Sequence, residues 1–299
     1  MISGIICLDK PEDMTSFSAV ARVRRITGTK KAGHAGTLDP MATGVLPVML
    51  SGATRFIEFL ETHEKAYTAG VKLGVTTDTL DVTGTVTSTQ EPHVRREELE
   101  RTLKSFTGRI MQVPPMYSAV HSGGKRLYEL ARSGIEVERE PREVNITKLE
   151  LLGFDDVNQS FSIAVTASKG TYIRSLAHDI GQALGCGAVL TSLRRTYACG
   201  FDESECVTLE WLEEHAASLD SAVIPVENAL KHFPRVRVSR MQSERFSNGG
   251  ELDIARLPSL KGSGIFRVFS DTGAFLGLGE TDMNKNTLKV KRVFVNQQA

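Results

Sequence analysis

The sequence predicts an α+β protein in which a large domain is followed by a small, β-rich unit. Its 299 residues can bury a full core and allow a main domain with an appendage. Segments with helical spacing alternate with strand-like segments through residues 1–230, whereas residues 235–299 alternate in the manner of strands separated by glycine-rich turns. Pro225 and Pro234 lie in the connector between the two parts, where we place the domain boundary.

The composition is that of an ordinary globular protein, with 24% charged and 40% hydrophobic residues. The formal net charge is zero, which argues against a uniformly basic nucleic-acid binder. Any RNA must therefore be bound by local patches of lysine and arginine.

The N-terminal segment predicts a first strand, Ile2 to Leu8, because its apolar run is too short for a signal peptide or a membrane span. We therefore expect a cytoplasmic protein. The four cysteines, Cys7, Cys186, Cys199 and Cys206, form no C-x-x-C pair. Their pattern favours reduced structural thiols over disulfides or zinc ligands, and we expect no metal site.

A helix is predicted after the turn at Lys10-Pro11, with Thr15 or Ser16 as its N-cap and Gly28 at its end. The residues expected to face inward are Phe17, Val20, Ala21 and Ile26. A basic cluster follows the outer face and the next turn: Arg22, Arg24, Arg25, Lys30 and Lys31. Such a cluster indicates either a solvated helix face or phosphate contacts.

The stretch Gly33 to Val48, GHAGTLDPMATGVLPV, places the carboxylate of Asp39 in a glycine-containing loop before a buried strand, Val45 to Leu50. Glycine permits unusual backbone conformations and Pro40 restricts the dihedral after the acid, so the loop is expected to be shaped. This arrangement suits a nucleophile or general base. The alternative is that Asp39 caps a turn and His34 is an ordinary loop histidine.

The whole of this stretch resembles the signature of the TruB-type tRNA pseudouridine-55 synthases. In that family the aspartate of the G-x-L-D-P core is the catalytic nucleophile, and the histidine before it contacts RNA. The resemblance therefore implies these roles for Asp39 and His34.

A second resemblance covers KAYTAGVKLGVTTDTLDVTG, which follows a segment of helical spacing from Ser51 to His63 with Phe56, Phe59, Leu60 and His63 on one side. Residues Lys65 to Val75 alternate as a half-buried strand, with Tyr67, Ala69, Val71 and Leu73 on one face. The family motif implies that Tyr67 lies against the target base. Asp78 and Asp81 are interpreted as turn-forming residues of the next loop.

A helix from Arg95 to Thr107, burying Leu99, Leu103 and Phe106, and a short strand from Arg109 to Val113 precede the longest non-periodic interval, Pro114 to Arg139. A short helix is expected near Arg126 to Arg132. The interval resembles the family's RNA-gripping thumb, which implies phosphate contacts for Lys125, Arg126 and Arg132; solvated charge is the alternative. Its Gly-Gly-Lys lacks the spacing of a phosphate loop.

Two strands, Val144 to Phe154 and Phe161 to Ser168, lead to SKGTYIRSLAHDIGQALG, which changes from strand to helix near Tyr172. This segment resembles the motif S-K-G-x-Y-I/V-R, whose arginine pairs with the catalytic aspartate and whose tyrosine lines the uridine pocket. The resemblance places Arg174 beside Asp39. A guanidinium can hold a carboxylate ionised and oriented.

The segment Gly187 to Phe201 is a further predicted strand and resembles a third motif. It implies Leu193 as the apolar wall of the base pocket, with Arg194 and Arg195 close to the RNA backbone. We also expect Lys10 to contact RNA. A helix from Leu209 to His215 follows.

The terminal unit has predicted turns at 248–250 and 271–273 and resembles a PUA-like RNA-binding domain. Its basic closing strand, Lys289, Lys291 and Arg292, could bind RNA or only make an edge soluble.

Together these resemblances imply a pseudouridine-synthase-like fold with a central mixed or antiparallel sheet and flanking helices. They imply isomerisation of uridine 55 in the T-arm of tRNA by base flipping, with no cofactor. Asp39 could attack C1′ or C6, or the reaction could proceed by elimination at C2′ with Tyr67 as the base. We expect no membrane partner and a monomer.

Two other functions are compatible with parts of the sequence. A catalytically inactive RNA-folding module would tolerate replacement of Asp39, because binding would depend on basic residues. An aspartate-nucleophile hydrolase would act on small molecules, but only one carboxylate is prominent, whereas glycosidases use two.

Overall fold

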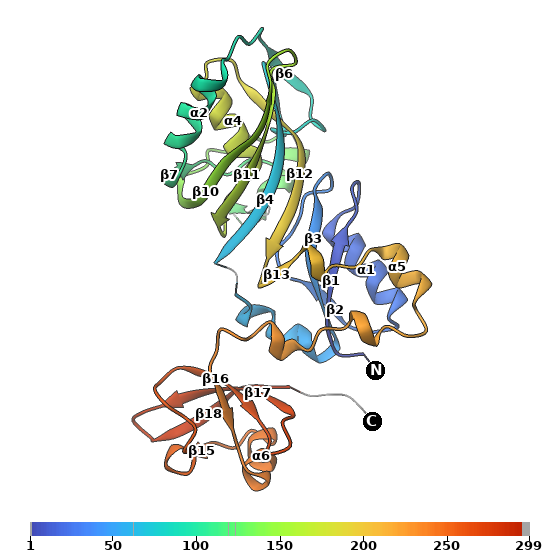
Figure 1. The fold of residues 1–299 in the computed structure, drawn as a ribbon, viewed down its shortest axis with the longest axis vertical. Coiled ribbons are helices and arrows are strands. Elements are labelled where there is room, and N and C mark those ends of the chain that lie inside the picture. Colours follow the sequence, from blue (N-terminus) through green and yellow to red (C-terminus); the bar gives the residue numbers. More distant parts are fainter. Residues whose placement is uncertain (1, 62, 119, 123, 295–299) are drawn as a thin grey trace.

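The computed structural model describes residues 2–61, 63–118, 120–122 and 124–294. Within these residues the larger sheet has nine strands, in the order β1-β3-β12-β4-β11-β10-β7, with β2 beside β3 and β13 beside β12 (Figure 1). Their bounds are β1 (Gly4–Lys10), β2 (Ala32–His34), β3 (Thr43–Leu50), β4 (Glu64–Leu73), β7 (Gly108–Gln112), β10 (Arg142–Asp155), β11 (Ser160–Ser168), β12 (Ala188–Ala198) and β13 (Phe201–Asp202). Neighbours are antiparallel except β3 and β12, so the predicted mixed sheet is confirmed.

Helices cover the apolar face of this sheet. They are α1 (Ser16–Ile26), α2 (Arg96–Ser105), α4 (Ile173–Ala183) and α5 (Leu209–Glu214). In Figure 1, α2 and α4 lie against the upper strands, and α1 and α5 lie beside β1 and β3. Strand β4 alternates as predicted, because Tyr67, Ala69, Val71 and Leu73 all enter the core that these helices share. The alternation of β4 therefore orients one whole face of the sheet towards the helices.

Helix α1 buries a different face from the predicted one. Thr15 is the N-cap and accepts from the backbone N–H of Ser18, as expected. Its buried residues are Ser16, Ala19, Val20 and Val23, whereas the Phe17 side chain is 80% exposed and Ala21 and Ile26 are half-buried. Ser16 faces inward because its hydroxyl donates to the carbonyl of Leu38 and accepts from the Leu38 N–H. The assignment of Phe17 to the core was therefore wrong.

The segment after β3 is the 3-10 helix η1 (Ser51–Phe59), which buries Ala53, Phe56 and Phe59. A spacing of three residues fits the three-residue turn of a 3-10 helix. His63 is exposed and does not share this face.

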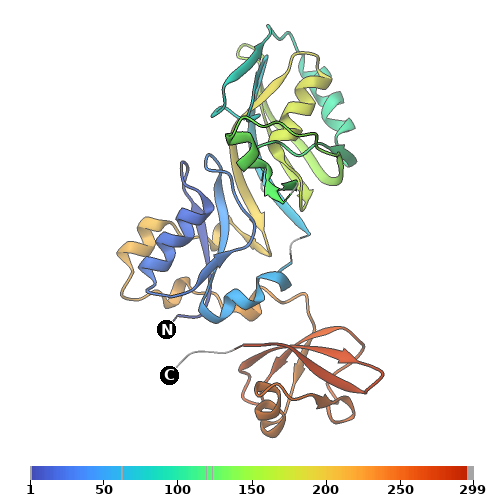
Figure 2. The same cartoon turned by 180° about the vertical axis from the view of Figure 1, so that it is seen from behind.

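Between β7 and β10 the chain forms an excursion, residues 113–141, which we call the thumb segment. It contains the hairpin β8 (His121–Ser122) and β9 (Lys125–Arg126) and the helix α3 (Leu127–Arg132). Figure 2 shows it, in green, on the same side of the sheet as α4. A second hairpin, β5 (Val75–Thr77) and β6 (Val86–Thr89), follows β4.

The C-terminal unit has a five-stranded sheet of its own. Its elements are β14 (Arg235–Arg237), α6 (Arg240–Ser247), β15 (Leu252–Asp253), β16 (Ile265–Phe269), β17 (Phe275–Asp282) and β18 (Thr287–Val293). Helix α6 was not predicted, although Ser239 and Gln242 form a capping box that is recognisable in the sequence.

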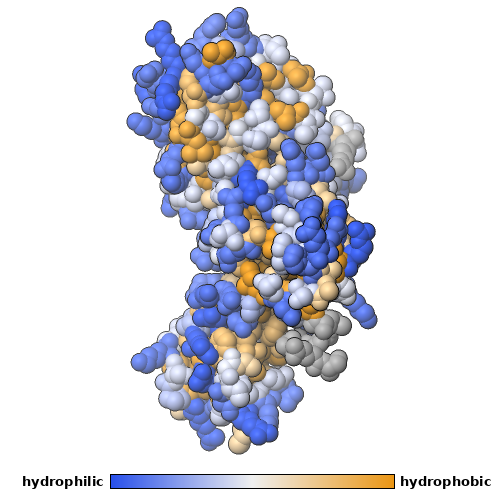
Figure 3. Space-filling view, turned by 45° about the vertical axis from the view of Figure 1, so that its right-hand side comes forward, coloured by the Kyte–Doolittle hydropathy of each residue, from blue (hydrophilic) through white to orange (hydrophobic). Residues whose placement is uncertain are grey.

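The two units share an apolar core. Phe56 and Phe59 of η1 pack with Phe269, Phe275 and Leu278 of the C-terminal sheet. The ring centroids of Phe56 and Phe275 are 5.8 Å apart. Figure 3 shows apolar side chains at the narrow waist between the units. The C-terminal unit is therefore packed onto the main domain through side-chain contacts as well as through the connector.

Candidate active site

Asp39 lies in the loop between β2 and β3, and several contacts hold this loop in one shape. The hydroxyl of Ser16 bonds both backbone groups of Leu38, and the ammonium of Lys10 donates to the carbonyl of Pro40. Gly44 has φ +97°, and a Cβ there would lie 2.2 Å from the carbonyl oxygen of Arg195. The Asp39 side chain remains 35% exposed, so its carboxylate is both positioned and reachable.

Arg174, at the N-terminal end of α4, contacts the Asp39 carboxylate with two hydrogen bonds. Nε donates to Oδ2 at 2.8 Å and an Nη donates to Oδ1 at 3.2 Å. The same guanidinium donates to the carbonyls of Thr79, at 3.0 Å, and Tyr117, at 2.8 Å. Arg174 therefore joins the Asp39 loop to the β5–β6 loop and to the thumb segment. A charge-assisted bidentate pair keeps a carboxylate ionised and fixes its orientation.

Asp81 is more than the turn residue that the sequence predicted. Its Oδ1 accepts from the hydroxyl and N–H of Thr83 and from the hydroxyl of Thr79, which is a turn-forming role. The residue is 4% exposed, however, and its Oδ2 lies 3.7 Å from Nε of Arg174. Arg174 is therefore held between two carboxylates. Asp78 only caps the Thr85 N–H, as expected of a turn aspartate.

Tyr67 faces the same region from β4, and its side chain is 9% exposed. Burial raises the pKa of the Tyr67 phenol, and the charge of Asp39 adds to this rise, whereas the charge of Arg195 opposes it in part. The phenol thus lies among the side chains that surround Asp39.

His34 lies on β2 and is half-buried. Burial lowers its pKa, and the Arg195 cation lowers it further, so the imidazole is neutral at pH 7. Its Nδ1 has no hydrogen-bond partner within the described residues. A neutral ring can stack or hydrogen-bond, so contact with RNA would not depend on an ionic bond.

Tyr172 is the N-cap of α4, two residues before Arg174, and Leu193 lies on β12. The backbone N–H and carbonyl of Tyr172 are both bonded by the side chain of Gln112, at 2.8 and 3.1 Å. Leu193, 7% exposed, helps to line a cavity of about 410 Å³ together with Met41, Thr43, Ala69 and Ser192.

Two of the predicted RNA contacts are engaged within the protein. Lys10 is fully buried, and its ammonium donates to the carbonyls of Pro11, Met14 and Pro40. Arg194 forms a bidentate pair with Asp9 and a further pair with Glu203. For Lys10 the expectation of an RNA contact was wrong in this conformation, because its side chain supports the Asp39 loop from beneath.

Arg195 was also expected near the RNA backbone, but its side chain is completely buried. That expectation was wrong for a physical reason: the guanidinium lies inside the Asp39 loop, where it donates to backbone carbonyls. Strand alternation places Arg195 on the buried face with Leu193 and its half-buried neighbour Arg194 on the other face, a signal that was missed in the sequence.

Other basic residues differ in availability. Lys125 and Arg126 of β9 are exposed, whereas the side chain of Arg132 falls outside the part of the chain that is described. The closing strand of the C-terminal unit presents little free charge, since Lys289, Lys291 and Arg292 each pair with a carboxylate. Arg22 pairs with Glu213, but Arg24, Arg25, Lys30 and Lys31 are exposed beside the site.

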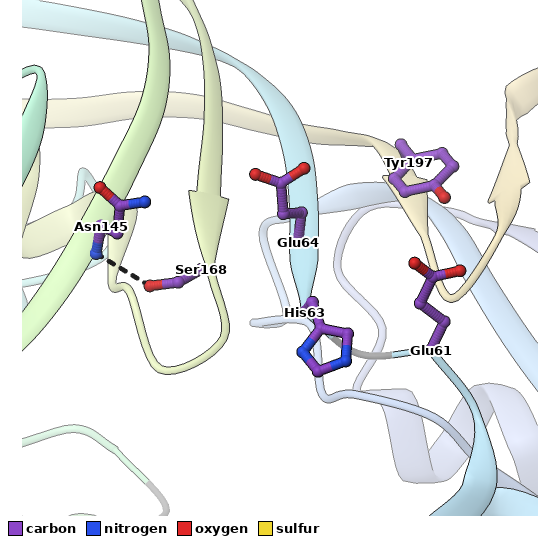
Figure 4. Close-up of a pocket in the computed structure, with 6 residues that line it drawn as sticks. All are labelled: Glu61, His63, Glu64, Asn145, Ser168 and Tyr197. Atoms are coloured by element: carbon purple, nitrogen blue, oxygen red, sulfur yellow. Dashed lines mark hydrogen bonds between the residues drawn. The ribbon is translucent and has the colours of Figure 1, made fainter. Parts of the chain in front are cut away.

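A second cavity, of about 340 Å³, lies away from Asp39 and is lined by Glu61, His63, Glu64, Asn145, Ser168 and Tyr197 (Figure 4). Its two glutamates would repel phosphate, so this cavity does not suit RNA. Among the described residues, no group of three His, Cys, Asp or Glu side chains could hold a metal ion. Over the same residues, every helix is too short or too polar to span a bilayer.

Three family models match successive parts of the chain, and all three describe pseudouridylate synthases of the TruB type. The family model "TruB family pseudouridylate synthase (N terminal domain)" matches residues 24–173, "tRNA pseudouridylate synthase B C-terminal domain" matches 174–231, and "Pseudouridine synthase II TruB, C-terminal" matches 234–294.

Among curated proteins, tRNA pseudouridine synthase B of Azoarcus sp. (strain BH72) is 47% identical over 99% of this chain and 96% of its own length. The protein of the same name from Clostridium perfringens (strain 13 / Type A) is 40% identical over 99% of this chain and 100% of its own.

Solved structures support the fold. A chain in the crystal structure of a Cbf5-Nop10-Gar1 complex has a TM-score of 0.74 at 28% identity, covering 98% of this chain and 85% of that one. A chain in the structure of an H/ACA RNP bound to a substrate RNA containing 2′-deoxyuridine has a TM-score of 0.73 at 26% identity, covering 99% and 86%. The predicted fold class is therefore confirmed.

Proposed function

The chain belongs to the TruB family of pseudouridylate synthases, and from this premise we propose that it converts uridine 55 in the T-loop of tRNA to pseudouridine. The observation that carries the proposal is the Asp39 carboxylate paired with Nε and one Nη of Arg174, on a loop that further hydrogen bonds hold in place. The relatives named tRNA pseudouridine synthase B support tRNA as the substrate. The neighbour whose structure contains a substrate RNA supports action on a polynucleotide.

Base flipping is the first step of the proposed reaction, because a uridine inside a folded T-arm is out of reach of Asp39. His34 is neutral and half-buried, so it can fill the space that the base leaves without attracting a counter-ion. Tyr67 and Leu193 would enclose the flipped uracil from two neighbouring strands, because Leu193 pairs in register with Ala69, two residues after Tyr67.

Asp39 is the proposed nucleophile. Arg174 bonds both carboxylate oxygens and fixes their direction, which removes the need to reorganise the carboxylate during the reaction. The N1–C1′ bond breaks, the uracil rotates, C5 joins C1′, and the C5 proton is released to solvent. Three routes lead to this overall change in bonds. Asp39 attacks C1′, Asp39 attacks C6, or the reaction proceeds by elimination at C2′ with Tyr67 as the base.

Substrate binding is proposed to involve the exposed basic residues Lys125 and Arg126 of the thumb segment. Arg174 connects this segment to the active site through the carbonyl of Tyr117. Closure of the thumb segment over RNA would therefore act on the position of Arg174 and, through it, on the Asp39 carboxylate. We further propose residues 1–230 as the catalytic domain and 235–299 as a PUA-like RNA-binding domain, acting in the cytoplasm as a monomer.

The test is tritium release from a tRNA transcript labelled at C5 of uridine. The unmodified chain should release tritium, and Asp39→Asn should lower release below detection while binding the transcript normally. Asp78→Asn, which removes a carboxylate that only caps a turn, should behave like the unmodified chain. A transcript with cytidine at position 55 should yield no release.

Each competing function predicts a different result. An RNA-folding module would bind tightly with no release by any variant. A small-molecule hydrolase would act on free nucleosides without folded RNA. Release that survives in Asp39→Asn would exclude Asp39 as the nucleophile.

A further inference from the structure

Arg195 lies on β12, the strand between β3, which follows the Asp39 loop, and β4, which carries Tyr67. On one side it pairs in register with Gly44 of β3, and on the other with Tyr67 of β4. It therefore has a neighbour in each of the two strands that carry the site.

The side chain of Arg195 has no exposed surface, and within the described residues it donates to backbone carbonyls. Nε donates to the carbonyl of Val45 at 2.7 Å, and the two Nη atoms donate to Gly36 at 3.1 Å and Thr37 at 3.4 Å. The carbonyls of Gly36 and Thr37 lie on the Asp39 loop, and that of Val45 lies in β3, which follows the loop. The guanidinium thus clamps the loop from inside.

No carboxylate pairs with Arg195 within the described residues, in contrast to Arg174 and Arg194. Burying a cation without a counter-ion costs free energy. Well-made hydrogen bonds to carbonyls offset part of this cost, but apolar residues could fasten a loop without it. Fastening the loop therefore does not by itself explain why the buried residue is a cation.

The groups that face this cation supply an explanation. Tyr67 is the cross-strand partner of Arg195, and the cation lowers the pKa of the phenol against the larger effect of burial, which raises it. The other charged or titratable groups around the phenol are Asp39 and Cys199. Lys65 and His34 also lie near Arg195, and the cation adds to burial in lowering the pKa of each.

We propose that Arg195 is a positioning residue for pseudouridine formation, which holds the Asp39 loop by three carbonyls and stabilises the deprotonated phenol of Tyr67 as the base of the reaction. This inference rests on the proposed function. In the elimination route the Tyr67 oxygen takes the C2′ proton, the C2′–H pair forms the C1′–C2′ double bond, and the N1–C1′ pair leaves on uracil. The proton returns to C2′ when C5 adds to C1′.

The test compares Arg195→Gln, which keeps donors but removes the charge, with Arg195→Lys, which keeps the charge but loses the fork. Arg109→Gln, on the exposed strand β7, is the matched control. Single-turnover tritium release is measured from pH 6 to pH 10. Arg195→Gln should lower kcat roughly 10- to 100-fold at neutral pH, with KM nearly unchanged. The alkaline rise in rate should move upward by about one pH unit.

Two further measurements separate positioning from mere fastening. In a Tyr67→Phe background, Arg195→Gln should cause no further change in the pH profile. Ultraviolet difference titration should show one phenol, absent in Tyr67→Phe, ionising at higher pH in Arg195→Gln and at its original pH in Arg195→Lys.

An equal loss of rate at every pH, or a tyrosine titration that Arg195→Gln leaves unmoved, would overturn the proposal and leave Arg195 as a loop fastener. The titration needs no RNA substrate. It therefore distinguishes failure of this inference from failure of the proposed function, which would appear as no tritium release by the unmodified chain. If Arg195→Gln does not fold, Arg195→Lys decides: a shifted pH profile despite its retained charge would contradict the inference.

Discussion

A single guanidinium organises the candidate site. Arg174 donates to Asp39, Thr79 and Tyr117, which lie on three separate loops, and its side chain is only 4% exposed. Because the donors of arginine are arranged in a rigid plane, fixing one of these loops constrains the direction of the others. The geometry of Asp39 therefore depends on loops that are remote in sequence.

Arg174→Lys tests this dependence at the scale of one residue. A lysine ammonium can still pair with Asp39, but it cannot also serve both carbonyls in the same plane. We expect kcat to fall by about 100-fold or more, since carboxylate orientation is lost, while tRNA affinity changes little. Single-turnover tritium release and filter binding measure the two quantities. Arg96→Lys on the exposed face of α2 is the control, and an unchanged kcat in Arg174→Lys would contradict the role.

At the scale of an element, the N-terminal end of α4 supports the site because it carries Arg174. Further along the same helix, Asp179 lowers the stability of the fold at neutral pH. Ile173, Leu176 and Ile180 bury the apolar face of α4. Asp179 is half-buried in the middle of the helix. Burial raises the pKa of Asp179 to about 6.

The pH dependence of stability follows from this raised pKa. Between the ordinary aspartate pKa of 3.8 and about 6, the folded chain binds more protons at Asp179 than the unfolded chain does, so stability falls as pH rises. Asp179→Asn removes this loss. We expect the variant to melt roughly 2–4 °C higher at pH 7.5, with the difference vanishing towards pH 4.

Thermal unfolding at several pH values measures this effect. Asp155→Asn is the matched control, because hydrogen bonds from Asn158 hold the pKa of Asp155 below its usual value. That variant should gain nothing at pH 7.5. A gain in Asp179→Asn that is independent of pH would show that the carboxylate charge is not the cause.

At the scale of the whole molecule, the C-terminal unit is part of the packing of the main domain. Phe275 lies against Phe56, and Arg292 pairs with Glu58 on the same 3-10 helix. The basic strand of this unit is largely neutralised by its own carboxylates. Its contribution to stability is therefore more directly supported than its contribution to RNA affinity.

Deletion of residues 235–299 should expose Phe56 and Phe59 and lower the melting temperature by several degrees, because burial of each phenylalanine stabilises by about 1.5–3 kcal/mol. Binding of a hydrophobic dye should increase. At low temperature the shortened chain should keep its kcat, since Asp39, Tyr67 and Arg174 all lie in the main sheet and its loops. A shortened chain that melts like the full chain would contradict the shared core.

The sequence by itself determined the features that depend on local pattern. These include the α+β class, a helix cap at Thr15 or Ser16, the inward face of β4, and the segments that carry Asp39 and Arg174. Local hydrogen bonding and two-residue alternation act between neighbours, so the chain order records them. The long motifs also identified the family before any contact was known.

Only the tertiary structure decided which charges are buried and what they meet. Lys10 and Arg195 are buried and support the Asp39 loop from inside. Asp81 lies close to Arg174. On α1, Ser16 is buried and Phe17 faces solvent. Each of these outcomes depends on a partner that is distant along the chain. Whether a charged side chain is solvated or buried depends on whether folding brings acceptors within about 3 Å of it, a distance that residue order does not encode locally.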